Sequence, residues 1–428
     1  MGLNPTGGIE VRVRGIGAGG VGIGDLPDGR VVFLPRTAPG DLVRVTLVQE
    51  KSRWARGELM EVLEEGDGRQ VAPCPRYGEC HGCALQHLEY SRQLLWKGRI
   101  VGDALRRIGG LASDDPEVEP SPRELAYRNK ATMTLRRLAG GRVVAGFHQL
   151  SDRKRILDLG PECLLLIPEL ARLWGELRSA WGPDADLLPQ GRELRLTLRA
   201  GEAGGALLVR GGWGEGRPEA LLAAVPGLAS VWREEKDGGV RLLAGKPALH
   251  LSWMGESIEV TGGAFVQVNQ EGGEALHRFV LEEVGAVEGR TIIEGYCGAG
   301  VLGRKLAFRG ARVLGIESDP LGVAEARRGA PEGFQVVQGR VEELLADHLP
   351  ADLVILNPPR AGLEARIPEA LASDPVESMV YVSCDPATLA RDLARLGDAY
   401  GMEGVRSFDL FPQTGHVETV VFLRRRSG

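Results

Sequence analysis

The chain has 428 residues, of which 43% are hydrophobic and 26% are charged, and its formal net charge is −6. This length suffices for two or three domains, and no apolar run approaches the ~18 residues of a membrane span. The net negative charge taken alone argues against a nucleic-acid binder, whose domains are usually basic. The start lacks the order of a signal peptide, so we expect a cytoplasmic protein.

The first 65 residues are expected to form short strands separated by glycine, proline and aspartate turns. Strands are predicted at Ile9–Arg14, Arg30–Leu34, Leu42–Val48 and Gly57–Leu63. Short strands at this spacing are typical of a small barrel. Two interpretations stay open, an OB-type barrel that binds nucleic acid and any other small β-domain.

The predicted secondary structure of the rest of the chain changes along the sequence. A helix is predicted over 91–109 and basic strands over 125–160, whereas 161–260 give no clear pattern. After residue 263, helices and strands alternate, which predicts a parallel α/β sheet. The helices are expected near Glu271–Val284, Leu302–Arg309 and Gly322–Arg328, and the strands at Thr291–Glu294, Arg312–Ile316, Val336–Val337, Leu353–Leu356 and Met379–Ser383.

Three of the six cysteines, Cys74, Cys80 and Cys83, form a C-x5-C-x2-C cluster, and Cys163 follows much later. Without a secretory signal a disulfide framework is not expected, and metal ligation is the better interpretation. Four thiolates can hold a zinc ion or an iron–sulfur cluster, and the spacing alone favours neither.

A glycine loop with the pattern G-x-G-x-x-G begins at Gly298, directly after a predicted strand. The next strand ends at Glu317, whose carboxylate can accept hydrogen bonds from a ribose. NAD and adenosylmethionine sites share this pattern. Asn357-Pro358-Pro359 after a later strand favours a methyltransferase that acts on a planar base, although Arg360 stands where amino-group methyltransferases carry an aromatic residue.

A candidate nucleophile, Cys384, directly follows the last predicted strand, at the end of an α/β sheet where ligands bind. Further along, His416 and Glu418 lie two residues apart, and in a strand they would share one face. Either side chain could act as a general base.

Together these segments resemble the RNA (uracil-5-)-methyltransferase family over nearly the whole chain. The closest likeness is to the 23S ribosomal RNA uridine methyltransferases that carry both a TRAM domain and a [4Fe–4S] cluster. The resemblance implies a Rossmann-like adenosylmethionine-dependent methyltransferase domain, an N-terminal OB-type TRAM barrel and a small α+β central domain with the cluster. The expected boundaries are 1–66 for TRAM, 67–92 with 125–262 for the central domain, and 93–124 with 263–428 for the methyltransferase domain.

The resemblance also assigns roles to residues. Cys384 is the implied nucleophile and Glu418 the implied base, with His416 second. S-adenosyl-L-methionine is the implied cofactor, and the residues matching its site are Gln267, Tyr296, Gly298, Gly300, Glu317 and Asn357. The implied cluster ligands are Cys74, Cys80, Cys83 and Cys163. The target base must leave its stack to reach such a site, and Phe265 is a plausible stacking partner.

The chain departs from the family pattern at four positions: Val301, Arg340, Asn357 and Asp385. Three alternatives remain open: a transfer RNA methyltransferase, an NAD-linked oxidoreductase, and a non-catalytic metal-bearing RNA-binding factor. The oxidoreductase leaves Cys384, Glu418 and the cysteine cluster without a purpose. We expect a monomer that binds RNA, preferably ribosomal RNA, and no membrane.

The net charge is unevenly distributed along the chain. Residues 1–160 carry 24 basic and 20 acidic side chains, and residues 123–155 carry nine basic side chains against Glu124 and Asp152. A basic first part is compatible with RNA binding despite the acidic total. We therefore expect Arg128, Lys130 and Arg136 to matter for RNA affinity.

Overall fold

The structure is a computed structural model that describes residues 8–426 except 237 and 264. Its contacts divide the chain into two compact units. The first comprises Met1–Glu124, Cys384–Ala394 and Arg406–Thr419, and the second comprises Leu125–Ser383, Arg395–Val405 and Val420–Gly428. Among the described residues, no helix is long and apolar enough to cross a membrane.

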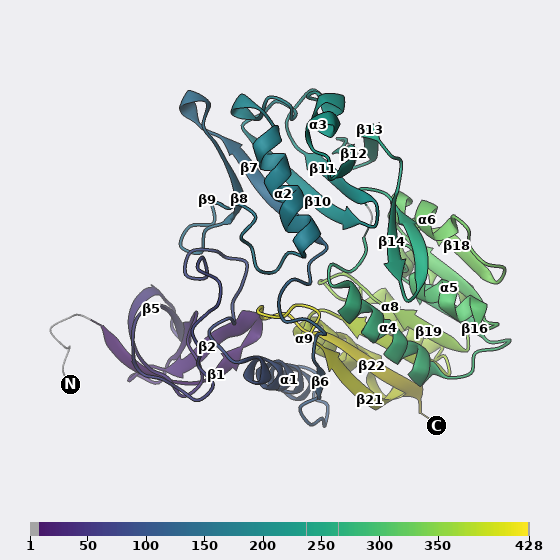
Figure 1. The fold of residues 1–428 in the computed structure, drawn as a ribbon. Helices are drawn as coiled ribbons and strands as arrows, with labels where there is room; N and C mark the ends of the chain where they lie inside the picture. The colour runs from purple at the N-terminus through teal and green to yellow at the C-terminus, as the bar shows by residue number, and fades with distance from the viewer. Residues whose placement is uncertain (1–7, 237, 264, 427–428) are drawn as a thin grey trace. The chain divides into compact units, whose positions relative to one another are not determined.

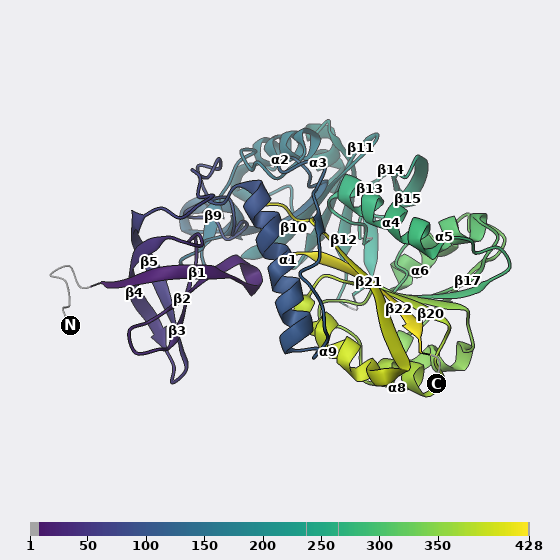
Figure 2. The same cartoon turned by 90° about the horizontal axis from the view of Figure 1, so that it is seen from below.

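The first unit begins with a closed five-stranded barrel of order β1-β2-β3-β5-β4, which confirms the predicted barrel (Figure 2). Its strands are β1 (Ile9–Gly17), β2 (Val21–Asp25), β3 (Val31–Leu34), β4 (Leu42–Glu50) and β5 (Trp54–Glu64). Alternate residues point inward, and the core holds valines such as Val11, Val32 and Val43, each at most 2% exposed.

Strand β2 was expected to be a turn because it is rich in glycine. The glycines are instead needed because neighbouring atoms pack closely against this strand. A Cβ on Gly22 would lie 1.9 Å from Thr37 Oγ1. A Cβ on Gly24 would lie 2.3 Å from Val11 Cγ1. Close approach of a neighbour is one of the few reasons for glycine inside a strand.

After the barrel comes helix α1 (Tyr90–Arg107), close to the predicted 91–109. The helix buries two polar side chains completely, Gln93 and Lys97, beside apolar Val101 and Leu105. Polar groups buried to this extent need partners, and both find them on the segment that follows β21 (Tyr400–Phe408). Strand β6 (Val118–Glu119) pairs in parallel with Ser407 and Phe408 at the end of β21.

The second unit contains a seven-stranded sheet of order β13-β12-β11-β10-β7-β8-β9 (Figure 1). Three of its strands lie in the segment 125–160, where basic strands were predicted, and four lie in 161–260, which gave no clear sequence pattern. Helix α2 (Pro168–Ala180) packs on it through Leu173, Trp174 and Leu177. The strands are β7 (Lys130–Arg137), β8 (Val143–His148), β9 (Ile156–Asp158), β10 (Glu193–Gly201), β11 (Gly204–Arg210), β12 (Leu228–Glu234) and β13 (Val240–Gly245). Helix α3 (Pro218–Ala224) precedes β12, and β14 (Leu249–Trp253) pairs with β15 (Glu256–Val260).

The α/β part has the strand order β18-β17-β16-β19-β20-β22-β21-β6. The first five strands pair in parallel, as predicted. Its strands are β16 (Thr291–Gly295), β17 (Arg312–Glu317), β18 (Phe334–Gln338), β19 (Leu353–Leu356), β20 (Ser378–Ser383), β21 and β22 (Glu418–Arg425). Its helices are α4 (Gln270–Val284), α5 (Val301–Phe308), α6 (Pro320–Arg327), α7 (Val341–Leu344), α8 (Arg366–Ser373) and α9 (Pro386–Leu396).

Strand β22, which the sequence reading did not assign, runs against its neighbour β20. The Arg425 N–H at the end of β22 donates to the carbonyl of Glu377, the residue before β20, at 3.0 Å. The two strands are therefore antiparallel, and β22 begins at the edge of the sheet where β20 ends. Parallel pairing brings the ends of β16 and β19 to that same edge.

Candidate functional site

The glycine loop leaves β16 at this edge and is held by the neighbouring strand. Both Tyr296 and Cys297 donate their N–H groups to the carbonyl of Ile316, at 2.9 and 3.3 Å. The Gly298 N–H donates to Glu317 Oε2 at 2.9 Å. Tyr296 adopts a φ of 62°, which is rare for a residue with a side chain. Such conformations cluster at ligand sites.

The glycines of the loop have different purposes. Gly298 has a φ of 55°, and a Cβ there would meet no atom within 4 Å, so its backbone borders open space. At Gly300 and Gly303 a Cβ would lie 2.5 and 2.6 Å from the ring of Phe334. Only Gly298 therefore leaves the backbone accessible to a ligand, while the other two glycines allow helix α5 to pack.

Glu294 is a site residue that sequence reasoning did not single out. It is 7% exposed, and burial raises its pKa to about 8. Its Oε2 has no hydrogen-bond partner among the described residues. A buried carboxyl with one unpartnered oxygen beside an open glycine loop, with Glu317 at the tip of the next strand, fits a ligand with amine and hydroxyl donors such as adenosylmethionine. Its position at the end of β16 was the available signal.

The remaining predicted cofactor residues lie near the starts and ends of elements. Gln267 is half-buried, and its Cβ borders Gly273 of α4. Asn269, two residues after Gln267, caps α4, since its Oδ1 accepts the Gly272 N–H at 3.1 Å. Asn357 directly follows β19, and its N–H donates to the Gly295 carbonyl at 3.4 Å. Phe265 is 65% exposed, which leaves its ring accessible, and its role as a stacking partner stays a prediction.

The candidate nucleophile stands at the beginning of a helix. Cys384 is half-buried and joins β20 to Asp385, the residue before α9. Asp385 Oδ1 accepts the N–H groups of Ala387 and Thr388, both at 3.0 Å, which is N-cap geometry. The departure at Asp385 thus has a structural role, and the helix N-terminus beside Cys384 favours an anion.

The candidate base opens β22. Glu418 is 4% exposed and is the first residue of that strand. Glu418 lies seven residues before Arg425, and Cys384 lies seven residues after Glu377, so an uninterrupted antiparallel ladder would place Glu418 opposite Cys384. Opposite residues in such ladders have Cα atoms about 4.5–5.5 Å apart, with their side chains on one face.

His416 was expected to share a strand face with Glu418, but it lies in the irregular segment before β22. Its N–H donates to Thr414 Oγ1 at 3.3 Å, and its ring packs edge-on against Phe411 with centroids 5.9 Å apart. The period-two argument fails because the strand begins only at Glu418.

The cysteine loop is ordered by its own backbone. The Cys80 N–H donates to the Arg76 carbonyl at 2.8 Å, and the Gly82 N–H donates to Cys80 Sγ at 3.3 Å. A thiol sulfur that accepts an N–H is suited to thiolate ligation. Cys74, Cys80 and Cys83 belong to the first unit and Cys163 to the second. Among the described residues no metal-holding group of three or more His, Cys, Asp or Glu is found, so the four-cysteine ligand set stays a prediction.

Comparisons with known proteins bear on the family to which the chain belongs. Residues 334–426 match the family model described as tRNA (Uracil-5-)-methyltransferase, and residues 8–60 match the TRAM domain. An uncharacterized RNA methyltransferase of Gloeobacter violaceus is 35% identical over 443 residues, covering 97% of this chain and 96% of that protein. The chain belongs to the RNA uracil-5 methyltransferase family.

Two further likenesses each cover 97% of the methyltransferase. A relative from Nostoc, also an uncharacterized RNA methyltransferase, is 34% identical and covers 97% of this chain and 96% of its own. The crystal structure of Pyrococcus abyssi tRNA (uracil-54, C5)-methyltransferase in complex with S-adenosyl-L-homocysteine is 25% identical, with a TM-score of 0.75. It covers 97% of this chain and 99% of its own. Adenosylmethionine-dependent methylation of uridine C5 in RNA is thereby supported.

Two other departures from the family pattern have packing or surface roles in this methyltransferase. Val301 is the first residue of α5 and packs against an apolar cluster that includes Trp253. Arg340 is half-exposed and forms an ion pair with Glu364 at 2.6 Å and another with Glu342. These contacts do not involve the glycine loop.

Several basic side chains of the segment 123–155 form contacts within the fold. Arg137 donates to four backbone carbonyls, those of Asp184, Ala185, Pro189 and Gly191. Arg136 pairs with Glu193 at 2.7 Å. Burial and the charges of Arg199 and Arg210 lower the pKa of Lys130 to about 7. These contacts give Arg137 a role in the fold, and the expectation that Arg128, Lys130 and Arg136 matter for RNA affinity stays a prediction.

Proposed function

We propose that the methyltransferase modifies a uridine of 23S ribosomal RNA, with Cys384 as nucleophile and Glu418 as base. The observation that supports these roles is the antiparallel run of β22, which starts beside the end of β20. A thiol and a carboxyl from two neighbouring strands would then face one base from one edge of the sheet.

The proposed reaction has two stages, methylation of C5 and release of the product from Cys384. Cys384 Sγ bonds to C6 of the uracil, which places electron density on C5. Adenosylmethionine supplies the methyl group: its S–CH3 bond breaks as the bond to C5 forms, and S-adenosylhomocysteine is the leaving group. Glu418 then accepts the C5 proton, the C6–S bond breaks, and the thiolate of Cys384 is released. The buried position of Glu418 keeps bulk water from the proton it receives.

RNA containing 5-fluorouridine tests the roles, because fluorine cannot leave C5 as a proton does. We expect a stable covalent complex between protein and RNA, detected on a denaturing gel. Cys384→Ala should form none. Persistence of the complex in Cys384→Ala, or its absence in the unaltered enzyme with cofactor present, would refute the assignment.

The choice of ribosomal RNA rests on the sequence resemblance to enzymes that carry both a TRAM domain and a cysteine cluster. Transfer RNA is the second candidate, because the matched family model and the Pyrococcus structure are both described as acting on it. Mapping 5-methyluridine by mass spectrometry in both RNA classes from a deletion strain decides between them. Loss from transfer RNA alone would overturn the first choice.

We further propose that Cys74, Cys80, Cys83 and Cys163 bind a [4Fe–4S] cluster. The N–H donated to Cys80 Sγ and the half-buried thiols suit such a site. Anaerobically purified protein should show broad visible absorbance and contain iron. Colourless protein with one zinc ion per chain would refute the iron–sulfur assignment, since zinc does not absorb visible light.

A further inference from the structure

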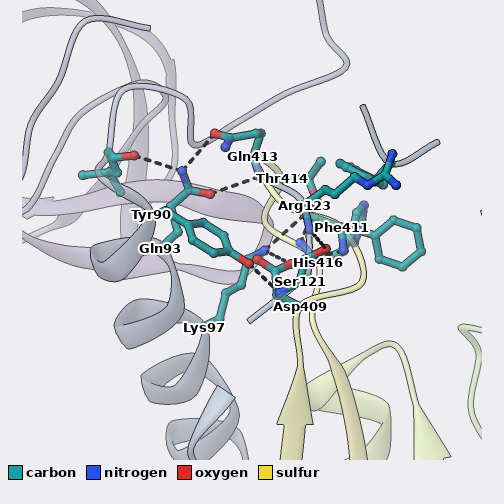
Figure 3. Close-up of polar contacts among 12 residues, drawn as sticks. Tyr90, Gln93, Lys97, Ser121, Arg123, Asp409, Phe411, Gln413, Thr414 and His416 are labelled. Atoms are coloured by element: carbon teal, nitrogen blue, oxygen red, sulfur yellow. Dashed lines mark hydrogen bonds and ion pairs between the residues drawn. The ribbon is translucent and has the colours of Figure 1, made fainter. Parts of the chain in front are cut away.

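The loop from Asp409 to Val417 connects β21 to β22 and ends directly before Glu418. In Figure 3, Tyr90, Gln93 and Lys97 point from helix α1 toward this loop. Gln93 and Gln413 pair reciprocally: Gln93 Nε2 donates to Gln413 Oε1 at 2.9 Å, and the Gln413 N–H donates to Gln93 Oε1 at 3.0 Å. Both side chains are at most 3% exposed. The side-chain amide of Gln93 thus pairs with both the side-chain oxygen and the backbone N–H of Gln413, 320 residues away in sequence.

The backbone of Gln413 is held as firmly as its side chain. Its carbonyl accepts the N–H groups of Ala84 and Leu85, at 2.9 and 3.0 Å, and these two residues directly follow Cys83. Its φ is 68°, a left-handed conformation that a residue with a side chain adopts at a cost. Such a conformation persists only where the surroundings impose it.

The beginning of the loop is fixed by a second buried contact. Lys97 Nζ lies 2.6 Å from Asp409 Oδ1 and 3.2 Å from the Phe411 carbonyl oxygen. Thr414 Oγ1 donates to the same carbonyl at 2.7 Å and accepts the His416 N–H at 3.3 Å. The order imposed by α1 therefore extends to within two residues of Glu418.

The end of the loop has no room to move toward the barrel. A Cβ on Gly415 would lie 2.2 Å from the carbonyl carbon of Gly19 and 2.3 Å from the Gly20 nitrogen. Backbone lies against backbone there, in the turn between β1 and β2. The loop is therefore held from one side by α1 and from another by the barrel.

We propose that Gln93 and Gln413 are positioning residues that fix the carboxylate of Glu418 for removal of the C5 proton. This inference rests on the proposed function. A base must lie within about 2.6–3.2 Å of the atom whose proton it takes, and a displacement of 1 Å can cost on the order of a hundredfold in rate. Cys384 attack and methyl transfer do not need Glu418, whereas release of the product does. A loosened loop therefore slows release more than methyl transfer.

The test uses Gln93→Leu and Gln413→Gly in the full chain. The leucine has a similar size but cannot pair, and the glycine keeps the left-handed backbone and its carbonyl contacts while it loses the side chain. With ordinary uridine RNA and labelled adenosylmethionine, single-turnover methyl transfer should stay within about threefold of the unaltered enzyme. Release of methylated RNA should slow about tenfold or more, and a methylated covalent complex should accumulate on denaturing gels.

Val101→Ala is the matched control, because Val101 is fully buried on the same helix and has no part in the loop contacts. It should lower the melting temperature without trapping a complex. The positioning role would be overturned if neither Gln variant traps a complex and the turnover of both decreases only in proportion to the fraction of folded protein. If the unaltered enzyme forms no Cys384-dependent complex with 5-fluorouridine RNA, the proposed function fails instead.

Discussion

Lys97 and Asp409 form an ion pair with 2.6 Å between Nζ and Oδ1, and neither side chain is exposed to solvent. Burial lowers the pKa of Lys97, and the charge of Asp409 opposes that shift. Removing one partner of a buried pair leaves the other charge without compensation. Loss of one partner is therefore expected to destabilise the fold strongly, because the remaining charge would stay buried without compensation.

Lys97→Met should lower the free energy of unfolding by about 3–5 kcal/mol, because Asp409 would stay buried without its cation. The double variant Lys97→Met, Asp409→Leu should regain most of that loss, since apolar residues can replace a buried pair. Urea denaturation of the three proteins measures the effect. Equal destabilisation by the single and double variants would contradict this account.

Glu418→Gln should separate the two stages of the reaction. The amide cannot take the C5 proton, so methyl transfer should occur once and leave RNA bound to Cys384 through C6. Ordinary uridine RNA would then behave as fluorinated RNA does in the unaltered enzyme. A denaturing gel with labelled methyl groups detects the bound product.

Glu369→Gln is the control for that experiment, because Glu369 lies exposed on α8. This variant should turn over normally and trap nothing. Normal turnover in Glu418→Gln would assign the proton transfer to another group, and His416 would be the next candidate to replace.

The sequence was informative where one local rule decides the structure. Alternating strands and helices after residue 263 predicted β16 to β20 within a residue or two, since period and turn residues agree there. Strand β2 was missed because Gly22 and Gly24 resemble turn residues, and only the distant Thr37 and Val11 reveal why glycine is needed. Long-range packing of this kind leaves no local signal.

The same distinction applies to the candidate site. Cys384 and Gly298 follow strands and could be found from motif and position. The pairing of Gln93 with Gln413 could not, because 320 residues separate them. Glu294 becomes conspicuous only when its burial and its unpartnered oxygen are known. The partners of polar residues that are buried far from any motif can be identified only once the fold is known.

Gly298→Ala and Gly303→Ala should separate cofactor binding from folding. A Cβ on Gly298 would enter the open space above the loop, so the affinity for S-adenosylhomocysteine should fall on the order of tenfold, with at most about 1–2 kcal/mol of strain. A Cβ on Gly303 would lie 2.5 Å from Glu294 Oε2, and overpacking should cost about 1–3 kcal/mol. Calorimetric titration and thermal unfolding of both variants measure the two effects.

His87 should make the first unit less stable in mild acid. It is 3% exposed, its Nδ1 lies 2.6 Å from the Tyr77 hydroxyl, and burial lowers its pKa to about 4. The unfolded chain, with an ordinary pKa of about 6.5, binds a proton between these values while the folded chain does not. Stability therefore falls as the pH drops from about 6.5 toward 4, by about 2 kcal/mol at pH ~5.

Urea denaturation between neutral pH and pH ~5 measures that slope. His87→Gln removes one buried histidine whose pKa burial lowers to about 4, His277 being another, and should therefore reduce the slope. The variant also loses some stability at neutral pH because the Tyr77 contact changes. His348 is exposed, so His348→Gln should keep the slope of the unaltered protein. An unchanged slope in His87→Gln would contradict this account, because the variant lacks one buried histidine that gains a proton on unfolding.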